Sequence, residues 1–506
     1  MVLGELTDTE VKSKSLEYHF AVNTSCHGLK NVALAKHLPV RIFWIIAILL
    51  AFGALVSQIV MLTMQYASFS AVTEVKVMNQ KKMAFPAVTV CNYNRVMKSK
   101  LEKVAGKANV NVEDLQSYIT LGFGDFTWIW SVDNFTAEVE RNKEAMIQVR
   151  DKLRSSGYLK YTDLIDDTSY DLDQLLTPEA RCTWSGLPNL LTDELDACPL
   201  ELFTPVVTRF GRCFTINSDF PETLYQEKPG VGNGFRVWVN IHQDEYSENF
   251  MFGNSEEGIR VLVHHKKEFP VMETQGLAIS PGVHGYVGID WTKYIYAEPQ
   301  WGDCKVENLT YHQRYSSEAC KLECYVRYIQ DKCGCRPVSL PGDVARPVCE
   351  PLDMIQCVRD AETLYYLEEE PCGFECNPPC RRDEYPVTFS SAVITSRHIE
   401  HRLARVFNVT ASYFRQNLIY LDLYFQKMSY MFIHQKPGTT FSQLLGNIGG
   451  QLGLFIGASV ITISEVVEFL IMKCVFWNVE RRKRKQAEKE EPHNAETLQL
   501  KQNPAP

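Results

Sequence analysis

Two long apolar stretches bracket a mixed central region of the chain. Residues 42–64 are 23 positions without a formal charge, and residues 441–464 are 24 more. A helix of 24 residues is about 36 Å long, which exceeds the ~30 Å hydrocarbon core of a bilayer. The pattern therefore predicts two membrane-spanning helices, at residues 42–64 and 438–477.

The region between these stretches mixes strand and helix patterns. Period-two alternation or short β-rich runs predict strands at Met83–Cys91, Phe235–His242, Gly258–His265 and Asn417–Phe425. Residues 138–153 and 316–333 favour helices. Strands in the middle with helices at the periphery predict an α+β domain over residues 65–437.

The second apolar stretch carries a stripe of small residues and two acidic side chains. Its glycines recur at helical spacing, at Gly446, Gly450, Gly453 and Gly457. Gly457-Ala458-Ser459 places three small residues in a row, and Glu465 and Glu468 follow at i, i+3. Carboxylates at membrane depth are costly and usually face water or a bundle interior, which indicates a pore-lining helix. The alternative is a plain membrane anchor whose glycines serve helix packing.

The charge distribution predicts the topology. Lys36 and Arg41 precede the first stretch, and a basic run at residues 481–485 follows the second. By the positive-inside rule both termini are cytoplasmic, and the loop of about 370 residues between the spans lies outside. Three glycosylation sequons in that loop, at Asn134, Asn308 and Asn408, agree with this prediction. The charged tail at residues 478–506 is expected to be disordered.

Composition narrows the class further. A mean hydropathy of −0.18 excludes a transporter with many spans, and a net charge of −9 gives no indication of nucleic-acid binding. Fourteen of the 16 cysteines lie between Cys91 and Cys380, which predicts seven disulfides in an oxidising compartment. Zinc binding is the alternative, because Cys320-x3-Cys324 has metal-like spacing. The chain carries no HExxH, GxSxG or P-loop motif, so we do not expect an enzyme.

Nine motifs are distributed along nearly the whole folded chain: Cys26-His27-Gly28, FPAVTVCN at 85–92, TRFGRCF at 208–214, GNG at 232–234, QDEY at 243–246, WGDC at 301–304, LPGD at 340–343, GGQLGL at 449–454 and Gly457-Ala458-Ser459. Together they resemble the epithelial sodium channel/degenerin superfamily, and within it the acid-sensing ion channels.

This resemblance implies a homotrimer, or a heterotrimer with related subunits, that conducts sodium across the plasma membrane and is blocked by amiloride. It implies an outer domain of finger (about 92–200), β-ball (about 212–280), thumb (about 301–380) and palm strands between them, after a cytoplasmic segment at 1–41. The implied disulfides are Cys91–Cys213, Cys182–Cys198, Cys304–Cys380, Cys320–Cys376, Cys324–Cys372, Cys333–Cys357 and Cys335–Cys349.

The resemblance also assigns roles in conduction. Gly457, Ala458 and Ser459 would form the selectivity filter at a break in the second span. Gly446, Asn447, Gly450, Glu465 and Glu468 would line the pore. His27 and Gly28 would fold back near the inner pore and affect gating, although an isolated His-Gly pair predicts only a turn. Phe69 and Trp301 would couple the outer domain to the span, or merely pack.

Proton sensing would depend on carboxylates that oppose one another's ionisation. The positions that match are Asp244, Glu245, Asp360 and Glu362, with Lys228 at the subunit boundary. The alternative is that they are ordinary solvated charges. Histidines 264, 265 and 284 could titrate near pH 6.5, although exposed strand histidines are more often incidental.

The predicted function is a sodium channel opened by extracellular protons, without a cofactor or metal and with possible calcium modulation. Several departures from the acid-sensing pattern, at Ala71, Val77, Gln426 and Asn447, keep other stimuli open: a neuropeptide, a bile-acid-like amphiphile, mechanical force or constitutive opening. A hypothesis of another class is a two-pass adhesion or receptor protein without a pore.

Overall fold

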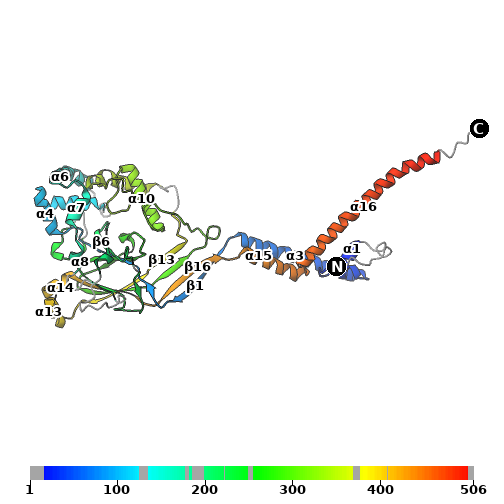
Figure 1. Ribbon diagram of the computed structural model, residues 1–506, viewed down its shortest axis with the longest axis horizontal. Helices are drawn as coiled ribbons and strands as arrows, with labels where there is room; N and C mark the ends of the chain where they lie inside the picture. Colours follow the sequence, from blue (N-terminus) through cyan, green and yellow to red (C-terminus); the bar gives the residue numbers. More distant parts are fainter. Residues whose placement is uncertain are drawn as a thin grey trace, which may run out of the picture. The chain divides into compact units, whose positions relative to one another are not determined.

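The computed structural model describes residues 16–124, 135–176, 182–184, 199–221, 223–248, 255–368, 376–406 and 408–499 (Figure 1). The chain forms two compact units. The first comprises Met1–Val72 and Pro437–Pro506, and the second comprises Thr73–Lys436.

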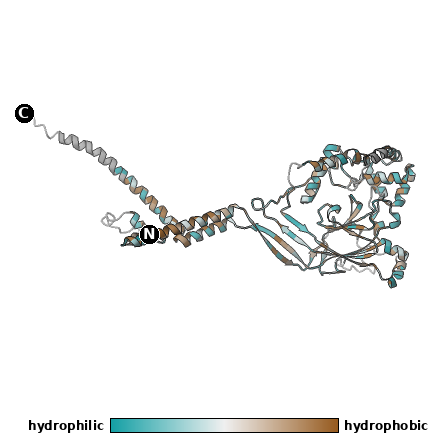
Figure 2. Cartoon of the chain, turned by 180° about the vertical axis from the view of Figure 1, so that it is seen from behind, coloured by the Kyte–Doolittle hydropathy of each residue, from teal (hydrophilic) through white to brown (hydrophobic). Residues whose placement is uncertain are grey.

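The first unit is helical. Its elements are α1 (Leu16–Asn23), α2 (Leu29–Leu34), α3 (Leu38–Ala67), α15 (Phe441–Ile456) and α16 (Val460–Gln499). Hydrophobic residues dominate the sequences of α3 and α15, as the colouring by hydropathy shows (Figure 2). Among the described residues α3 is the one helix that is long and apolar enough to cross a membrane by itself, and α15 with the start of α16 meets the same criterion as a bent pair.

The break between α15 and α16 lies at the Gly457-Ala458-Ser459 triplet. α15 begins with a capping box between Thr440 and Gln443, and it ends at Gly457, which has a φ of 65°. The two helices are bent by 70° at this point. Glycine adopts positive φ at little cost, so it is the expected residue where a helix ends in this way.

α16 continues to Gln499, so the tail prediction was wrong for residues 478–499: the structure has a helix there. The segment is rich in Glu, Lys, Arg, Ala and Gln, which have high helix propensity and form favourable pairs at i, i+4. The charge runs that suggested disorder also suit a solvated helix.

The second unit is built from four sheets. Their strand orders are β1-β16-β12-β13, β10-β9-β3-β6-β5, β14-β11-β15-β8-β4 and β2-β7. The strands are β1 (Ala71–Asn79), β2 (Met83–Ala84), β3 (Ala87–Asn92), β4 (Cys182–Trp184), β5 (Phe203–Thr208), β6 (Gly211–Ile216), β7 (Tyr225–Gln226), β8 (Phe235–Asn240), β9 (Ile259–His264), β10 (Leu277–Ile279), β11 (Val283–Ile289), β12 (Thr292–Ile295), β13 (Arg381–Glu384), β14 (Val387–Val393), β15 (Leu418–Phe425) and β16 (Ser429–Pro437).

Helices surround these sheets. They are α4 (Lys98–Ala108), α5 (Val112–Gly122), α6 (Phe135–Ser155), α7 (Tyr161–Thr168), α8 (Leu172–Leu175), α9 (Met272–Gln275), α10 (Ser317–Cys333), α11 (Pro351–Asp353), α12 (Arg359–Leu367), α13 (Arg397–Val406) and α14 (Ala411–Asn417). One hydrophobic core joins α4–α7 to α10–α12, and another fills the space between the two five-stranded sheets. The mixture of helices and strands agrees with the predicted α+β class.

The predicted strands and helices are present, with one division. Pro86 splits the run Met83–Cys91 into β2 and β3, because proline has no N–H to donate to a sheet ladder. The preceding residue, Phe85, donates its N–H to the carbonyl of Leu224 instead.

Five disulfides lie in the described residues: Cys91–Cys213, Cys304–Cys380, Cys320–Cys376, Cys333–Cys357 and Cys335–Cys349. They coincide with five of the seven pairs that the resemblance implies. Cys182 and Cys324 are also disulfide-bonded, while Cys198 and Cys372 lie outside the described residues. Disulfide bonding of Cys320 and Cys324 removes the zinc alternative for that pair.

Candidate functional site

Backbone hydrogen bonds form on both sides of the break in the second apolar segment. The N–H of Gly457 donates to the carbonyl of Gly453 at 3.1 Å, and the N–H of Ala458 donates to that of Leu452 at 3.2 Å. Ser459 directly precedes α16, and its N–H donates to Thr462 Oγ1 at 3.0 Å. Two carbonyl groups of the last turns of α15 are therefore paired within the segment, and the break is a defined backbone feature.

His27 lies directly against this break. Its N–H donates to the carbonyl of Ile456 at 2.9 Å. A Cβ built on Gly457 would lie 2.5 Å from Cδ2 of the His27 ring, closer than real Cβ contacts come. The sequence predicted both the triplet and the His-Gly pair, and the fold brings the two together.

Gly28 supplies the turn that directs His27 to this place. Its φ is 84°, and it precedes α2. A Cβ on Gly28 would come within 2.9 Å of Ile48 Cγ1 on α3. The His-Gly pair therefore forms a turn, as its local sequence predicts, and this turn also packs on α3.

The residues just before His27 hold Glu465 by hydrogen bonds. Oε2 of Glu465 accepts hydrogen bonds from Thr24 Oγ1 at 2.9 Å and from the N–H of Ser25 at 3.0 Å. The Ser25 hydroxyl also lies 2.6 Å from Thr462 Oγ1. Sequence reasoning missed Thr24, Ser25 and Thr462. The hydroxyl pair next to Cys26-His27-Gly28 was the available signal.

The other predicted pore residues are exposed. Gly446, Asn447 and Gly450 lie on exposed positions of α15, and a Cβ on either glycine would meet no atom within 4 Å. Glu468 is exposed, and within the described residues it makes no hydrogen bond or ion pair that would hold it. The glycine stripe is thus not used for packing within this chain at these positions.

The predicted acidic residues of the outer unit do not form one cluster within the described part of the chain. Asp244 is exposed, and Glu245 accepts from the N–H of Ser99 at 2.7 Å. Asp360 pairs with Arg359 at 3.0 Å, and Glu362 pairs with Arg209 at 3.6 Å. Within the described residues, no hydrogen bond or ion pair joins Asp244 or Glu245 to Asp360 or Glu362.

Three further predicted positions are placed separately. Lys228 is exposed. Phe69 has a φ of 45° and lies 5.9 Å from the ring of Tyr66. Trp301 is half-buried in a turn, where its N–H donates to the carbonyl of Glu298.

His264 and His265 are not exposed strand histidines that titrate near pH 6.5. His264 is buried on β9, with Nε2 2.8 Å from Thr89 Oγ1 and Nδ1 3.0 Å from the carbonyl of His265. Burial lowers the pKa of both rings to about 4. Burial also lowers the pKa of His284. His264 and His265 are therefore neutral near pH 6.5.

Two carboxyl groups that sequence reasoning missed have raised pKa values. Asp422 on β15 is buried, and burial raises its pKa although it accepts from the N–H of Gly232 at 2.9 Å. Burial likewise raises the pKa of Glu268, against the opposing charge of Arg314. For Asp422 the available signal was an isolated aspartate in an apolar strand, whereas nothing in the local sequence marked Glu268.

Two of the predicted glycosylation sites, Asn308 and Asn408, are exposed, and Asn134 lies outside the described residues.

Two apolar helical segments, a disulfide-linked domain between them, and a helix broken beside a carboxylate are features of membrane ion channels. The family model described as "Amiloride-sensitive sodium channel" matches residues 20–469. The chain belongs to this family of sodium channels, and the match covers both units.

Relatives agree with this assignment. Acid-sensing ion channel 1C of Danio rerio is 30% identical over 89% of this chain and 82% of its own length. Acid-sensing ion channel 2 of Homo sapiens is 29% identical over 89% and 85%. The bile acid-sensitive ion channel of Rattus norvegicus is 28% identical over 90% and 88%. A solved proton-activated chloride channel matches with a TM-score of only 0.32 at 7% identity, over 85% of this chain and 96% of that one, which supports no argument.

Proposed function

We propose that the chain forms a trimeric, amiloride-sensitive sodium channel of the plasma membrane that extracellular protons open. In this proposal both termini are cytoplasmic, and the second unit is the outer domain with finger, β-ball, thumb and palm. The membership in the sodium channel family supports the conduction of sodium. The names of the relatives support acid as the stimulus.

The observation that carries the proposal is the broken helix at Gly457-Ala458-Ser459. Irregular backbone at membrane depth is tolerated where it lines water or is buried in protein. Rings of carbonyl oxygens from symmetric subunits can replace the hydration shell of a cation. Three copies of this break around an axis would form such a ring, with Glu465 and Glu468 attracting cations on the cytoplasmic side.

The buried carboxyl groups support proton activation. A raised pKa brings a carboxyl closer to the range in which extracellular acid protonates it. Asp422 and Glu268 have this property in the second unit. Asp244, Glu245, Asp360 and Glu362 remain proposed sensors that would act together where subunits meet.

The test is whole-cell recording of the chain expressed alone. Acidification of the bath from pH 7.4 to about 5 should evoke an inward sodium current that amiloride blocks. Asp422→Asn and the combined neutralisation of the four proposed sensors should each shift the pH dependence. Good surface expression without an acid-evoked current would reject proton activation.

A second candidate is a sodium channel of the same family opened by another stimulus. The departures at Ala71, Val77 and Gln426 favour it, because the acid-sensing channels that the chain resembles carry a histidine at the first of these positions and carboxylates at the other two. The bile acid-sensitive relative makes an amphiphile the first compound to try. Current evoked by a bile acid at constant pH 7.4, in cells that do not respond to acid, would favour this candidate.

A further inference from the structure

A cavity of about 320 Å³ lies in the second unit, and none of the residues that the proposed function uses for conduction lines it. Three elements surround it: the end of β9 with the loop leading to α9, the first turn of α10, and β13 with the residues that follow it. We call it the β9–α10 cavity. Its volume is in the range of sites for small organic ligands.

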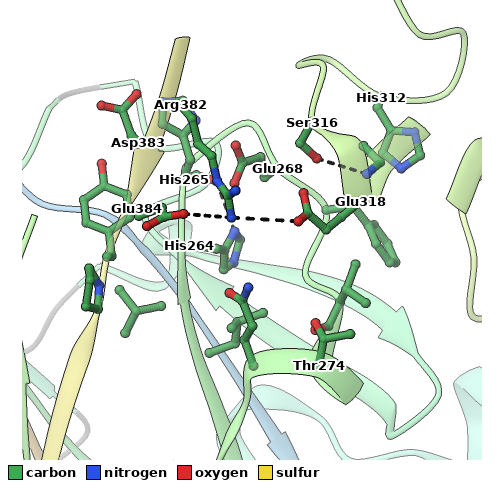
Figure 3. Close-up of a pocket in the computed structure, with 18 residues that line it drawn as sticks. His264, His265, Glu268, Thr274, His312, Ser316, Glu318, Arg382, Asp383 and Glu384 are labelled. Carbon is green, nitrogen blue, oxygen red and sulfur yellow. Dashed lines mark hydrogen bonds and ion pairs between the residues drawn. The ribbon is translucent and has the colours of Figure 1, made fainter. Parts of the chain in front are cut away.

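The polar wall of the cavity carries more negative than positive charge. Glu268, Glu318, Asp383 and Glu384 line it, against Arg382. Arg382 lies between Glu318 and Glu384, at 3.8 Å and 2.9 Å from their carboxylate oxygens (Figure 3).

A second arginine, Arg314, pairs with Asp383 at 2.8 Å and lies 3.7 Å from Glu268. Four carboxyl groups and two arginines give a formal surplus of two negative charges, and burial, which raises the pKa of Glu268, acts to reduce it.

The histidines of the cavity do not compensate this surplus at neutral pH. Burial lowers the pKa of His264 and His265 to about 4, and it lowers that of His312 against the opposing effect of Glu323. His264 and His265 are therefore neutral near pH 7, and burial disfavours the charged form of His312 as well.

His312 gives an independent indication of a ligand. Its side chain is only 2% exposed, its Nδ1 lies 3.5 Å from Oε2 of Glu323, and its Nε2 makes no hydrogen bond within the described residues. Buried polar groups are nearly always hydrogen-bonded, so the unpaired Nε2 at the cavity wall leaves one position for a further donor or acceptor. A neutral imidazole offers one donor and one acceptor.

The remaining wall is apolar and partly aromatic. Phe269, Val271, Tyr385 and Pro386 contribute to it. The ring of Phe269 lies 6.4 Å from that of His312, at 88°. A flat apolar group is the shape that such a wall accommodates.

We propose that the β9–α10 cavity binds a small organic cation, in which a protonated amine or amidinium is carried by a flat apolar group. The cationic end donates to Glu318 and Glu384 beside Arg382, and the apolar end lies against Phe269 and Tyr385. A metal ion is a poorer fit, because within the described residues no three His, Cys, Asp or Glu side chains are placed to hold one.

Binding at this place would bear on gating if the proposed function holds. β13 pairs with β12 in the sheet that also contains β1 and β16. β1 follows α3 in the chain and β16 precedes α15, so this sheet is covalently continuous with both apolar segments. A ligand held between α10 and β13 is expected to change the current, and that effect rests on the proposed function. Binding itself does not.

Binding can be measured on the full-length protein in lipid nanodiscs by saturation-transfer NMR, with benzamidine as the cationic probe and benzamide and benzoate as its neutral and anionic counterparts. Benzamidine is expected to bind with a Kd of about 0.1–1 mM. Benzamide and benzoate are expected to bind at least about tenfold more weakly.

Four variants locate the probe and separate charge from folding. Glu318→Gln and Glu384→Gln should each weaken benzamidine about tenfold. Arg382→Gln should strengthen the binding of benzamidine, whereas damage to the fold would weaken it. Thr274→Trp, at an exposed position in the wall of the cavity, should block binding without changing charge. Glu102→Gln, an exposed carboxylate on α4, is the matched control and should bind as the parent does.

The proposal is overturned if benzamidine does not bind, if benzamide or benzoate binds as well, or if these cavity variants bind like Glu102→Gln. The last outcome would place the cation elsewhere, for example in the pore. A chain that binds benzamidine as expected but carries no current would contradict the proposed function and leave the cavity assignment intact.

Discussion

At the scale of single residues, Gly457 is subject to two separate constraints. Its φ of 65° disfavours any residue with a Cβ, and the His27 ring occupies the space where that Cβ would lie. By contrast, Gly53 in the middle of α3 is helical, and an added Cβ there meets no atom within 4 Å. The two glycines therefore differ in what a methyl group would do.

Gly457→Ala should displace His27 and cost at least about 1 kcal/mol in backbone strain. We expect loss of sodium current per channel at the cell surface, measured by recording together with surface labelling. Gly53→Ala is the control and should retain current. Normal current in Gly457→Ala would contradict the requirement for glycine at the break.

The contact of Glu465 with Thr24 and Ser25 should protect the neighbouring thiol of Cys26, which is half-buried and free. Glu465→Gln keeps the shape but removes the charge that both donors contact. If the hydrogen bonds to residue 465 lose about 1 kcal/mol of stabilisation, maleimide should label Cys26 about fivefold faster. The measurement needs Cys474→Ser, because Cys474 is a free and exposed thiol.

Glu468→Gln is the matched control, because Glu468 is exposed and three residues further along α16. Equal labelling rates in the two variants would show that Glu465 does not hold the segment that contains Cys26.

At the scale of elements, α10 is cross-linked at several points along its length. Cys320 lies near its start and Cys333 at its end, while Cys335 follows it. These bonds are nested, so each shortens the loop that its neighbours close. The helix and the segments around it are thereby held together in the oxidised protein.

Nesting predicts the cost of removing individual disulfides. Cys304–Cys380 spans 76 residues in sequence, but with Cys320–Cys376 intact the loop that it closes is only about 20 residues. Its removal should therefore cost about 3 kcal/mol, similar to the removal of Cys335–Cys349, which spans 14. Denaturant titration of the two double Cys→Ser variants measures this, with Cys26→Ser as the control. A clearly larger cost for the outer bond would show that the nested bonds do not act in this way.

At the scale of the whole molecule, acid should affect folding as well as gating. The folded-state pKa of His264 is lowered to about 4, whereas an unfolded chain has the ordinary value near 6.5. Below pH 6.5 the unfolded state therefore binds the proton first, and stability is lost as the pH falls toward 4.

The contribution from His264 amounts to about 3 kcal/mol between pH 7 and pH 4. His264→Gln should flatten the dependence of unfolding free energy on pH over this range, and the exposed His398→Gln should not. An unchanged slope in His264→Gln would mean that the ring is protonated in the folded state.

The sequence by itself determined the properties that depend on neighbours along the chain. Absence of charge in residues 42–64 and 441–464 predicted the apolar helices, and alternation predicted β8, β9 and β15 closely. The division of the predicted strand at Pro86 and the helix after residue 477 were not predicted. Strand propensity does not show that the missing N–H of a proline interrupts the ladder, and a highly charged composition suits a solvated helix as well as a disordered tail. The pairing of the cysteines came from family resemblance, since an even count does not select a connectivity.

Only the tertiary structure decided which distant groups meet. Thr24 and Glu465 are 441 positions apart, and no local pattern predicts that one donates to the other. The same holds for His264, whose strand position gave no sign that its ring is buried against Thr89, and for the carboxylates gathered around Arg382. Hydropathy and periodicity are local quantities. Burial, the pKa shifts it causes and the shape of a cavity arise from packing between segments remote in sequence.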